Sequence, residues 1–522
     1  MVELCIGMVW SFALCYLLTP QVRRWASRLG LVDKPDGRRK LHGRCIPAAG
    51  GPLLLLSVGV ALLAAFLSSG EIQSEILKKT TPLVGLVLAA VIICAIGVLD
   101  DLGRLRGRHK LLGQVIAVAI VIASGVRINH IYLFNGVDAE LGNLAIPFTA
   151  FFLLGAINSL NLLDGMDGLL SSIAFFLCLV LGCLDLLAHN YQVTLTAYAA
   201  FVTAGALLAF LRYNFPPATI FLGDSGSMLI GLVIGVLAIK SSLKEHRGHP
   251  EVVTLIVPIA LLILPILDTV AAILRRKLTG RSIYNTDRSH LHHCLLRRLG
   301  DPRLVLFVIS FCCVVTGAGV LAGRLFDNEW VIVLSTLSVV VALIATRLFG
   351  HAELRLVLQS GQSLLVSLFH MPSASEPRQI EMRLHGNVDW RELWLRLLEW
   401  EETLSLCCLR LDVNAPALGE GYHARWERGS DKHEEEETLW SAQIPLTFKG
   451  RSIGKLEVKG GGNGESVGDK ISMLAKLVQD FEDNVLLIAN RSSMQRPISH
   501  LTSASVFRTA DREDPEFLRA NL

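Results

Sequence analysis

The sequence predicts an all-α membrane protein of about eleven transmembrane helices, followed by a small cytoplasmic α+β domain. The 522-residue chain is 52% hydrophobic and only 18% charged, whereas soluble globular chains carry about 25% charged residues. The apolar residues are concentrated in 1–350, and the rest has the mixed composition of a soluble domain. Lys and Arg cluster in short loops between the apolar runs, a pattern typical of membrane proteins.

Eleven apolar runs approach the length of about 17–25 residues that a membrane-crossing helix requires. The runs 111–126 and 225–240 are short, so we expect them to be buried among the other helices. Pro258 and Pro265 predict a kink in the ninth span. The predicted spans are 2–20, 50–69, 82–99, 111–126, 145–161, 168–188, 194–212, 225–240, 252–274, 304–323 and 330–347.

The loops between these spans predict the orientation of the chain. Twenty Lys and Arg follow the first, third and ninth spans, against six in the even-numbered loops. The positive-inside rule therefore places the odd-numbered loops and the C-terminal domain in the cytoplasm, and the N-terminus outside. The first run is followed by Arg23 and Arg24 without a cleavage pattern, which favours a membrane span over a removed signal peptide.

Two broad classes of function are disfavoured by composition. The net charge of +3, without interleaved basic and aromatic residues, argues against nucleic-acid binding. The eleven cysteines form no C-x-x-C pair, which argues against a zinc ribbon or a thioredoxin-type site.

Acidic residues collect at the ends of spans that face the cytoplasm in this topology. Carboxylates at membrane depth are costly and are usually functional. Their collection on one face is informative because the topology was inferred from other residues. They are Asp100, Asp101, Asp164, Asp167, Asp224, Asp268 and Asp287.

Asp100 and Asp101 end the third span. Two adjacent carboxylates cannot both be buried and ionised without a cationic partner. The pair therefore indicates a Mg²⁺ site or a group that positions a phosphate, and the alternative is the solvated end of a helix. Lys110 is near enough in sequence to contact a phosphate, or to extend to the membrane interface instead.

Asn158, Asn161 and Asp164 recur every three residues, so they share one helix face. Asp167 follows between glycines that permit a tight reversal. Amide and carboxylate oxygens suit Mg²⁺ and accept hydrogen bonds from a ribose or a base. Four such side chains in ten residues favour a binding site over a capped turn.

Residues 223–227, G-D-S-G-S, begin the eighth span. Their composition lets backbone N–H groups approach a phosphate at a helix N-terminus. Asp224 is typical of a helix N-cap, and as a metal ligand it would serve both roles.

Residues 287–293, D-R-S-H-L-H-H, lie in the most basic loop. Three imidazoles with neighbouring arginines, among them Arg288, predict an anion-binding patch suited to a diphosphate. Zinc is disfavoured because no finger-type ligand spacing is present, although three histidines alone do not exclude a metal. The basic run 33–42 contains Lys40 and His42, and its Pro and Gly residues predict an ordered loop.

Taken in order, these motifs resemble those of the polyprenyl-phosphate N-acetylhexosamine-1-phosphate transferases, a superfamily shared with phospho-N-acetylmuramoyl-pentapeptide transferase. The motifs are D-x-P-x-x-R-K-x-H, here with one extra residue, then D-D, N-x-x-N-x-x-D-G-x-D-G, G-D-x-G-S and H-x-H-H. The resemblance covers residues 1–350. Because Cys294 and not Glu-Lys follows the histidines, the chain looks like the bacterial N-acetylglucosamine (GlcNAc) branch.

The resemblance implies transfer of GlcNAc-1-phosphate from a UDP-sugar to polyprenyl phosphate at the bacterial inner membrane, with release of UMP. It would be the first membrane step of a cell-envelope polysaccharide. Mg²⁺ is the expected cofactor, with Mn²⁺ as a substitute. Another UDP-N-acetylhexosamine, or the muramoyl-pentapeptide donor, remains an alternative. We favour direct attack of the lipid phosphate over a covalent phospho-enzyme.

Residue roles are assigned on the matching positions. The expected metal ligands are Asn161 and Asp224. The expected catalytic residues are Asp100, Asp101, Asp164, Asp167, His290, His292 and His293. The expected substrate-binding residues are Lys40, His42, Lys110, Asn158, Asp164, Asp167, Asn214 and Arg288.

Beyond the membrane domain we expect a linker at 351–376, a soluble α+β domain at 377–492 and a disordered tail at 493–522. The expected elements are a Trp-rich helix at 388–404, strands at 405–413, 421–428, 438–448 and 451–459, and a second helix at 466–490. No catalytic constellation is visible there, which favours a regulatory or partner-binding role. A homodimer is a further expectation.

Two rival functions are compatible with parts of this sequence. A secondary transporter would also have many spans and intramembrane acids, but transporter sites usually lie near the middle of the membrane. A membrane sensor that acts through its soluble domain would leave the five motifs unexplained.

Overall fold

The computed structural model describes residues 1–33, 45–133, 137–246, 249–278, 290–351, 354, 378–385, 390–401, 403–415, 420–428, 440–448, 451–460, 472, 473, 475, 476 and 479. The chain forms two compact units, Met1–Gln359 and Ser360–Leu522. The predicted linker and tail, and most of the predicted helix at 466–490, lie outside the described residues.

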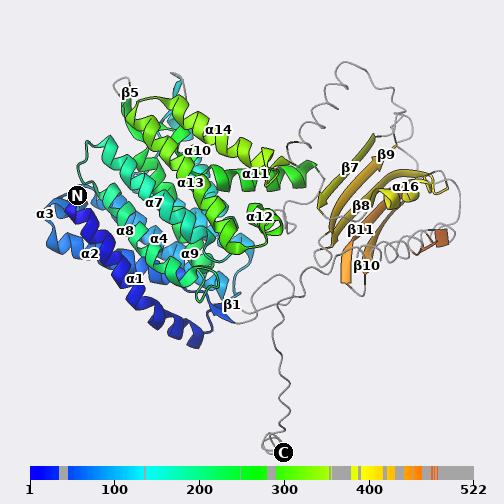
Figure 1. The fold of residues 1–522 in the computed structure, drawn as a ribbon, viewed down its shortest axis with the longest axis horizontal. Coiled ribbons are helices and arrows are strands. Elements are labelled where there is room, and N and C mark those ends of the chain that lie inside the picture. The colour runs from blue at the N-terminus through cyan, green and yellow to red at the C-terminus, as the bar shows by residue number, and fades with distance from the viewer. Residues whose placement is uncertain are drawn as a thin grey trace, which may run out of the picture. The chain divides into compact units, whose positions relative to one another are not determined.

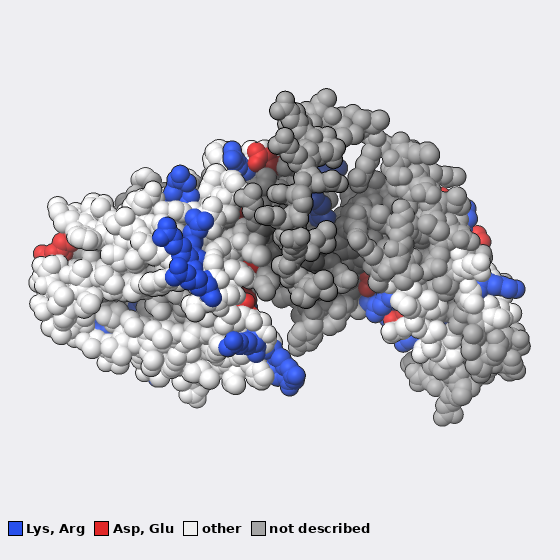
Figure 2. Space-filling view, turned by 90° about the horizontal axis from the view of Figure 1, so that it is seen from below, with Lys and Arg blue, Asp and Glu red and all other residues white. Residues whose placement is uncertain are grey.

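The first unit is a helical bundle (Figure 1). Its surface in Figure 2 is mostly neither acidic nor basic, as expected of helices that face lipid. The helices are α1 (Val2–Arg28), α2 (Gly50–Ser68), α3 (Gly70–Lys78), α4 (Thr80–Asp101), α5 (Gly107–Ala123), α6 (Ala145–Leu163), α7 (Leu169–Ala188), α8 (Leu195–Asn214), α9 (Gly223–Ser241), α10 (Ile256–Leu261), α11 (Ile263–Leu278), α12 (Leu291–Leu299), α13 (Pro302–Leu325) and α14 (Glu329–Ala345).

Each predicted apolar run contains a helix, although 252–254 of the ninth run lie in a strand, and not every helix has the length of a full span. Eight helices in the described part of the chain are long and apolar enough to cross a membrane. The shorter elements are α5, α14 and the pair α10–α11. The predicted kink lies between α10 and α11, where Pro265 has no N–H to donate to the Leu261 carbonyl.

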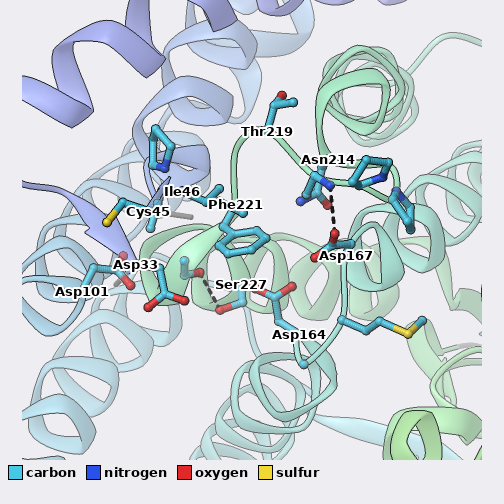
Figure 3. Close-up of a pocket in the computed structure, with 18 of the residues that line it drawn as sticks. Asp33, Cys45, Ile46, Asp101, Asp164, Asp167, Asn214, Thr219, Phe221 and Ser227 are labelled. Atoms are coloured by element: carbon cyan, nitrogen blue, oxygen red, sulfur yellow. Dashed lines mark hydrogen bonds between the residues drawn. The ribbon is translucent and has the colours of Figure 1, made fainter. Parts of the chain in front are cut away.

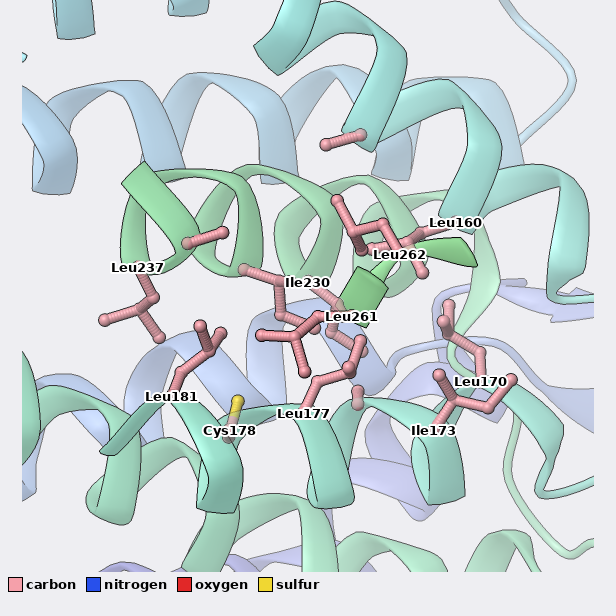
Figure 4. Packing of buried hydrophobic residues seen from close by; sticks show 14 of the residues in the cluster. Leu160, Leu170, Ile173, Leu177, Cys178, Leu181, Ile230, Leu237, Leu261 and Leu262 are labelled. Atoms are coloured by element: carbon pink, nitrogen blue, oxygen red, sulfur yellow. The ribbon is translucent and has the colours of Figure 1, made fainter. Parts of the chain in front are cut away.

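Helix α9 lies at the centre of the bundle, and 78% of the residues in its most apolar stretch are buried. Figure 4 shows side chains of α9 packed against α7, with Leu261 and Leu262 beside them. The expectation that 225–240 is buried is therefore confirmed. The same expectation for 111–126 holds for one face of α5 only, because Leu112 and Ile116 on the other face are exposed.

Glycines allow α2 and α4 to approach the start of α9 closely. A Cβ on Gly97 of α4 would lie 2.2 Å from Ser225 Cα, and a Cβ on Gly51 of α2 would lie 2.5 Å from Ser225 C. No side chain fits at either position without backbone displacement. This contact fixes the N-terminus of α9 against the C-terminal end of α4.

Short strands join loops that are distant in the sequence, which the all-α prediction for this unit did not include. A four-stranded sheet has the order β4-β3-β6-β5, formed by β3 (His130–Tyr132), β4 (Asp138–Glu140), β5 (Leu243–His246) and β6 (His249–Thr254). The pairing of β3 with β6 is parallel. It places the loops that follow α5 and α9 on the same side of the bundle.

A second strand pair lies near the start of α9. Strands β1 (Val32–Asp33) and β2 (Ile46–Pro47) are antiparallel, and Ala48 bridges Phe221 in the loop before α9. The loops after α1 and α8 therefore meet. In the order of the predicted spans, α5 and α9 are the fourth and eighth, and α1 and α8 are the first and seventh. The even-numbered loops therefore meet each other, and so do the odd-numbered loops, as the predicted topology requires.

The second unit has a five-stranded antiparallel sheet of order β10-β11-β8-β9-β7. Its elements are β7 (Arg378–His385), α16 (Trp390–Leu398), β8 (Leu406–Ala415), β9 (Glu420–Glu427), β10 (Trp440–Phe448) and β11 (Arg451–Gly460). Trp390 and Trp394 of α16 are buried in one core with Leu409, Leu411 and Trp426 of the sheet. The α+β expectation is confirmed, although β7 was not predicted and α16 is shorter than 388–404.

Replacing Gly97 by Ala tests the close contact between α4 and α9. The added methyl group must displace the backbone of α9, and overpacking of this kind costs about 1–3 kcal/mol of stability. We expect a lower melting temperature in detergent than for the wild type. The matched control is Gly59→Ala in α2, where a Cβ meets nothing within 4 Å; equal melting temperatures for the two variants would contradict this account.

Candidate active site

A cavity of about 1320 Å³ opens at the end of the bundle where α4 and α6 finish and α9 begins. Asp101, Asp164, Asp167 and Ser227 lie around it together with Asn214 and Phe221 (Figure 3). Its lining thus combines residues of the N-x-x-N-x-x-D-G-x-D-G and G-D-x-G-S motifs with Asp101 of the acidic pair. The acids gather at helix ends, in contrast to the mid-membrane position typical of transporter sites.

Asp101 caps the N-terminus of α9. Its carboxylate accepts hydrogen bonds from the backbone N–H of Asp224 at 2.8 Å and of Ser225 at 3.2 Å. A carboxylate at this position is stabilised by otherwise unpaired N–H groups and by the helix dipole. Gly223 is required beside it, because its φ is +68° and a Cβ would lie 2.6 Å from Asp101 Oδ2. Asp101 therefore positions α9.

Lys110 lies between the carboxylates of Asp100 and Asp224. Its Nζ lies 2.9 Å from Asp100 Oδ2 and 2.8 Å from Asp224 Oδ1. Asn161 Nδ2 also donates to Asp224 Oδ1, at 2.7 Å, and to Ser227 Oγ, at 2.7 Å. Lys110 of α5 and Asn161 of α6 thus converge on Asp224 of α9, and Lys110 also joins Asp100 of α4 to the cluster. Lys110 supplies the positive charge that an acidic pair requires.

Asn158 is one turn before Asn161 and is paired with a residue that the sequence analysis did not identify. Its Nδ2 donates to Gln114 Oε1 at 2.9 Å, and Gln114 Nε2 donates back at 3.3 Å. Gln114 is buried. A lone amide side chain within the apolar run 111–126 was the signal that would have revealed it. Asn158 does not line the cavity, and its amide joins α6 to α5.

Asp167 and Asn214 fix the loop that precedes α9. Asp167 Oδ2 accepts the Ala218 N–H at 2.8 Å. Asn214 Oδ1 accepts the Gly168 N–H at 3.1 Å, and Asn214 Nδ2 donates to the Ile220 carbonyl at 2.8 Å. The buried Asn214 amide therefore holds three segments together at the edge of the cavity. Phe221, which this loop carries, lines the cavity with its ring.

The histidine motif begins at a buried carboxylate of α11. Asp268 is fully buried, accepts the Leu291 N–H at 2.7 Å, and lies 3.3 Å from His290 Nδ1. It thus caps α12 and orients the first histidine. The sequence could not reveal this role of Asp268, because it depends on a contact with the start of α12, more than twenty residues away.

The three histidines have different environments. His292 packs against the backbone of Gly165, and a Cβ there would lie 2.3 Å from its Nε2. Burial, aided by the neighbouring His293, lowers the pKa of His292 to about 3. His292 is therefore neutral near pH 7, unlike the cationic group expected in an anion-binding patch. His293 lines the cavity, whereas His290 and His292 do not.

The pKa of Asp164 is raised well above its usual value. Burial is the largest cause, followed by the negative charges of Asp224, Asp101 and Asp167. Asp164 lines the cavity just beyond the end of α6. Its carboxyl therefore keeps a proton to higher pH than an exposed aspartate does.

The structure brings together most of the predicted site residues that it describes. Those lining the cavity are Asp101, Asn161, Asp164, Asp167, Asn214, Asp224 and His293. Asp100 and Lys110 lie behind this wall through their contacts with Asp224. Lys40, His42 and Arg288 lie outside the described residues, as does Asp287.

The Asp164 carboxyl yields a prediction about stability and pH. Its pKa is higher in the folded than in the unfolded protein, so ionisation destabilises the fold as the pH rises between the two values. Asp164→Asn removes this penalty. We expect the variant to melt at a higher temperature than the wild type at pH 8, and the difference to shrink as the pH falls towards the unfolded pKa of about 3.9.

The control for this measurement is Glu140→Gln, a change in exposed β4. Thermal unfolding in detergent across this pH range decides the question. A melting difference between Asp164→Asn and wild type that does not change with pH would contradict the assignment.

A family model and several named relatives match this chain. Residues 83–242, which contain the acidic pair and the motifs around Asn161 and Asp224, match the model of Glycosyl transferase family 4. A probable undecaprenyl-phosphate N-acetylglucosaminyl 1-phosphate transferase of Bacillus subtilis (strain 168) is 31% identical over 315 residues. That match covers 60% of this chain and 83% of the relative.

Two further relatives extend the comparison. A decaprenyl-phosphate N-acetylglucosaminephosphotransferase of Mycolicibacterium smegmatis is 31% identical over 359 residues, which is 66% of this chain and 88% of the relative. An undecaprenyl-phosphate alpha-N-acetylglucosaminyl 1-phosphate transferase of Yersinia pestis is 27% identical over 332 residues, which is 62% and 85%. The chain belongs to the polyprenyl-phosphate N-acetylglucosamine-1-phosphate transferase family.

Proposed function

We propose that this protein transfers GlcNAc-1-phosphate from UDP-GlcNAc to a polyprenyl phosphate and releases UMP. The observation that carries the proposal is the cluster around Asp224 of α9, which Lys110 of α5 and Asn161 of α6 contact in the lining of a cavity large enough for a nucleotide sugar. The three relatives described above match this chain over more than four-fifths of their own length. Their names describe transfer of GlcNAc-1-phosphate to a polyprenyl phosphate.

The reaction exchanges one phosphoanhydride for another. An oxygen of the lipid phosphate attacks the β-phosphorus of UDP-GlcNAc, the new P–O bond forms, and the bond to the bridging oxygen of UMP breaks. Little driving force is needed, so the protein mainly positions two anions and offsets their repulsion. Lys110 lies beside Asp100 and Asp224 and supplies fixed positive charge at the acidic cluster.

The same residues suit a bound Mg²⁺. Among the described residues, no three His, Cys, Asp or Glu side chains form a complete metal cage. Mg²⁺ does not require one, because it is usually held by one or two carboxylates together with waters and substrate phosphates. Asp224 would hold it with the amide oxygen of Asn161. When bound, the ion would stabilise the developing charge on the transferred phosphate.

The remaining residues would act on the substrates directly. The Phe221 ring offers a flat apolar surface against which a base can stack. Asp164 and Asp167 line the cavity beyond it and present carboxyl groups that accept hydrogen bonds from sugar hydroxyls. Among the three histidines of the motif, His293 is the one placed to contact a phosphate, because it lines the same cavity.

We further propose the eleven-span topology, with the cavity on the cytoplasmic side of a bacterial inner membrane. In this arrangement α10 and α11 together make one span, and α5 and α14 cross as short helices. The parallel pairing of β3 with β6 supports it, because both strands then lie outside. The contact of Ala48 with Phe221 supports it on the opposite side. A protein partner for the second unit and a homodimer stay predictions.

Replacing Asp224 by Asn tests the proposed function. The variant keeps the shape of the side chain but removes the charge on which Lys110 and Asn161 converge. We expect turnover to fall about a hundredfold or more, the scale on which one preorganised electrostatic group acts. The assay follows formation of lipid-linked GlcNAc phosphate and UMP from UDP-GlcNAc, polyprenyl phosphate and Mg²⁺ in membranes.

The matched control is Asp138→Asn in exposed β4, which should leave turnover unchanged. Lack of lipid-linked product from the wild type with UDP-GlcNAc, and with every other UDP-N-acetylhexosamine tried, would refute the enzyme assignment. Wild-type turnover in Asp224→Asn would remove Asp224 from the site.

Cysteine labelling tests the topology. In a protein whose exposed Cys5 and Cys45 are changed to Ser, we expect Glu140→Cys to react with an impermeant maleimide in intact spheroplasts. Arg104→Cys should react only after the membrane is permeabilised, because the positive-inside rule places its loop in the cytoplasm. The reverse pattern of labelling would invert the proposed orientation.

A further inference from the structure

One wall of the cavity is formed by the last turns of α1, a helix whose basic residues the sequence analysis used only for topology. Pro20, Arg23, Arg24 and Ser27 line this wall. The helix is fixed in place by α8, because the Tyr16 ring packs against Tyr213 at 5.4 Å. The Tyr213 hydroxyl also donates to the Tyr16 carbonyl at 3.2 Å. The two arginines therefore project from a rigid element.

Arg23 has a hydrogen-bond donor without an acceptor. Its Nε is buried and has no hydrogen-bond partner in the part of the chain that the structure describes. No described carboxylate lies within 4 Å of either Arg23 or Arg24. Lys110, by contrast, is neutralised by two carboxylates. A buried guanidinium donor without an acceptor is unfavourable, so this position suits an incoming anion.

The charge distribution around the cavity points to the same kind of ligand. Five carboxylates line the same cavity, those of Asp33, Asp101, Asp164, Asp167 and Asp224, and they repel a phosphate. A guanidinium presents a planar fork of N–H groups that matches phosphate oxygens in a bidentate contact. Two adjacent arginines in the lining of this cavity therefore offer the positive surface that a phosphate needs among these carboxylates.

We propose that Arg23 and Arg24 form a phosphate-binding subsite on the α1 wall of the cavity. The inference rests on the proposed function, because the phosphate comes from one of the two substrates of that reaction. The polyprenyl phosphate arrives from the bilayer, to which α1 would present the exposed side chain of Trp25, followed by exposed Leu29 just after the helix. The diphosphate of the UDP-sugar is the other source. Both present the same chemistry to the arginines.

Kinetics of Arg23→Gln and Arg24→Gln separate these sources. Each variant is assayed with polyprenyl phosphate varied at saturating UDP-GlcNAc, and then with the two substrates exchanged. We expect KM for one substrate to rise about tenfold, the effect of losing one charge-assisted hydrogen bond, with a smaller change in kcat. A rise for the lipid identifies the lipid phosphate as the ligand, and a rise for UDP-GlcNAc identifies the diphosphate.

Two further variants make the test decisive. Arg28→Gln changes the same helix outside the cavity lining and should keep both KM values. Arg23→Lys retains the charge but loses the bidentate fork, so its KM should lie between those of wild type and Arg23→Gln. Melting temperatures show which variants remain folded, and Arg24→Gln and Arg23→Lys provide the readout if Arg23→Gln does not fold.

The failure of this inference is distinguishable from failure of the proposed function. If the wild type and Arg28→Gln form lipid-linked product while folded Arg23 and Arg24 variants keep both KM values, the subsite is refuted and the function stands. If the wild type forms no product, the proposed function itself is refuted.

Discussion

The site depends on the hydrogen bonds from the N-terminus of α9 to Asp101. Helix α9 is the most buried of the eight candidate spans, and two of its backbone N–H groups donate to the Asp101 carboxylate of α4. This contact requires glycine at position 97, where the helices touch, and at position 223, where the backbone adopts a positive φ. With α9 fixed in this way, Asp224 at its first turn meets Lys110 and Asn161. Rearrangement of any of these elements would disperse the acidic cluster.

The cavity combines an acidic wall with basic groups, which suits a reaction between two anions. Burial and like charge hold the pKa of Asp164 above its usual value, while burial keeps His292 neutral. Positive charge in the described site comes from Lys110 and from the arginines on α1. The proposed metal adds to it at Asp224. This division accounts for a site rich in carboxylates whose substrates are themselves negatively charged.

The sequence revealed the residues of the site better than it revealed their roles. Hydrophobic length located the helices, and the acidic motifs identified Asp101, Asn161, Asp164 and Asp224 because carboxylates are rare at span ends. The cap formed by Asp101, the pairing of Gln114 with Asn158, and the burial of His292 depend on contacts between distant segments. The small sheet of β3 to β6 was missed for the same reason, since its strands are too short for a periodic pattern.

The measurement that tests the central claim most directly is the turnover of Asp101→Asn in the UDP-GlcNAc and polyprenyl phosphate assay. The amide oxygen can still accept one N–H of α9, but its NH₂ group faces the other donor and the charge is lost. The account predicts that turnover falls roughly ten- to a hundredfold, because a charge-assisted hydrogen bond is worth about 1.5–3 kcal/mol. Wild-type turnover in a folded Asp101→Asn protein would contradict it.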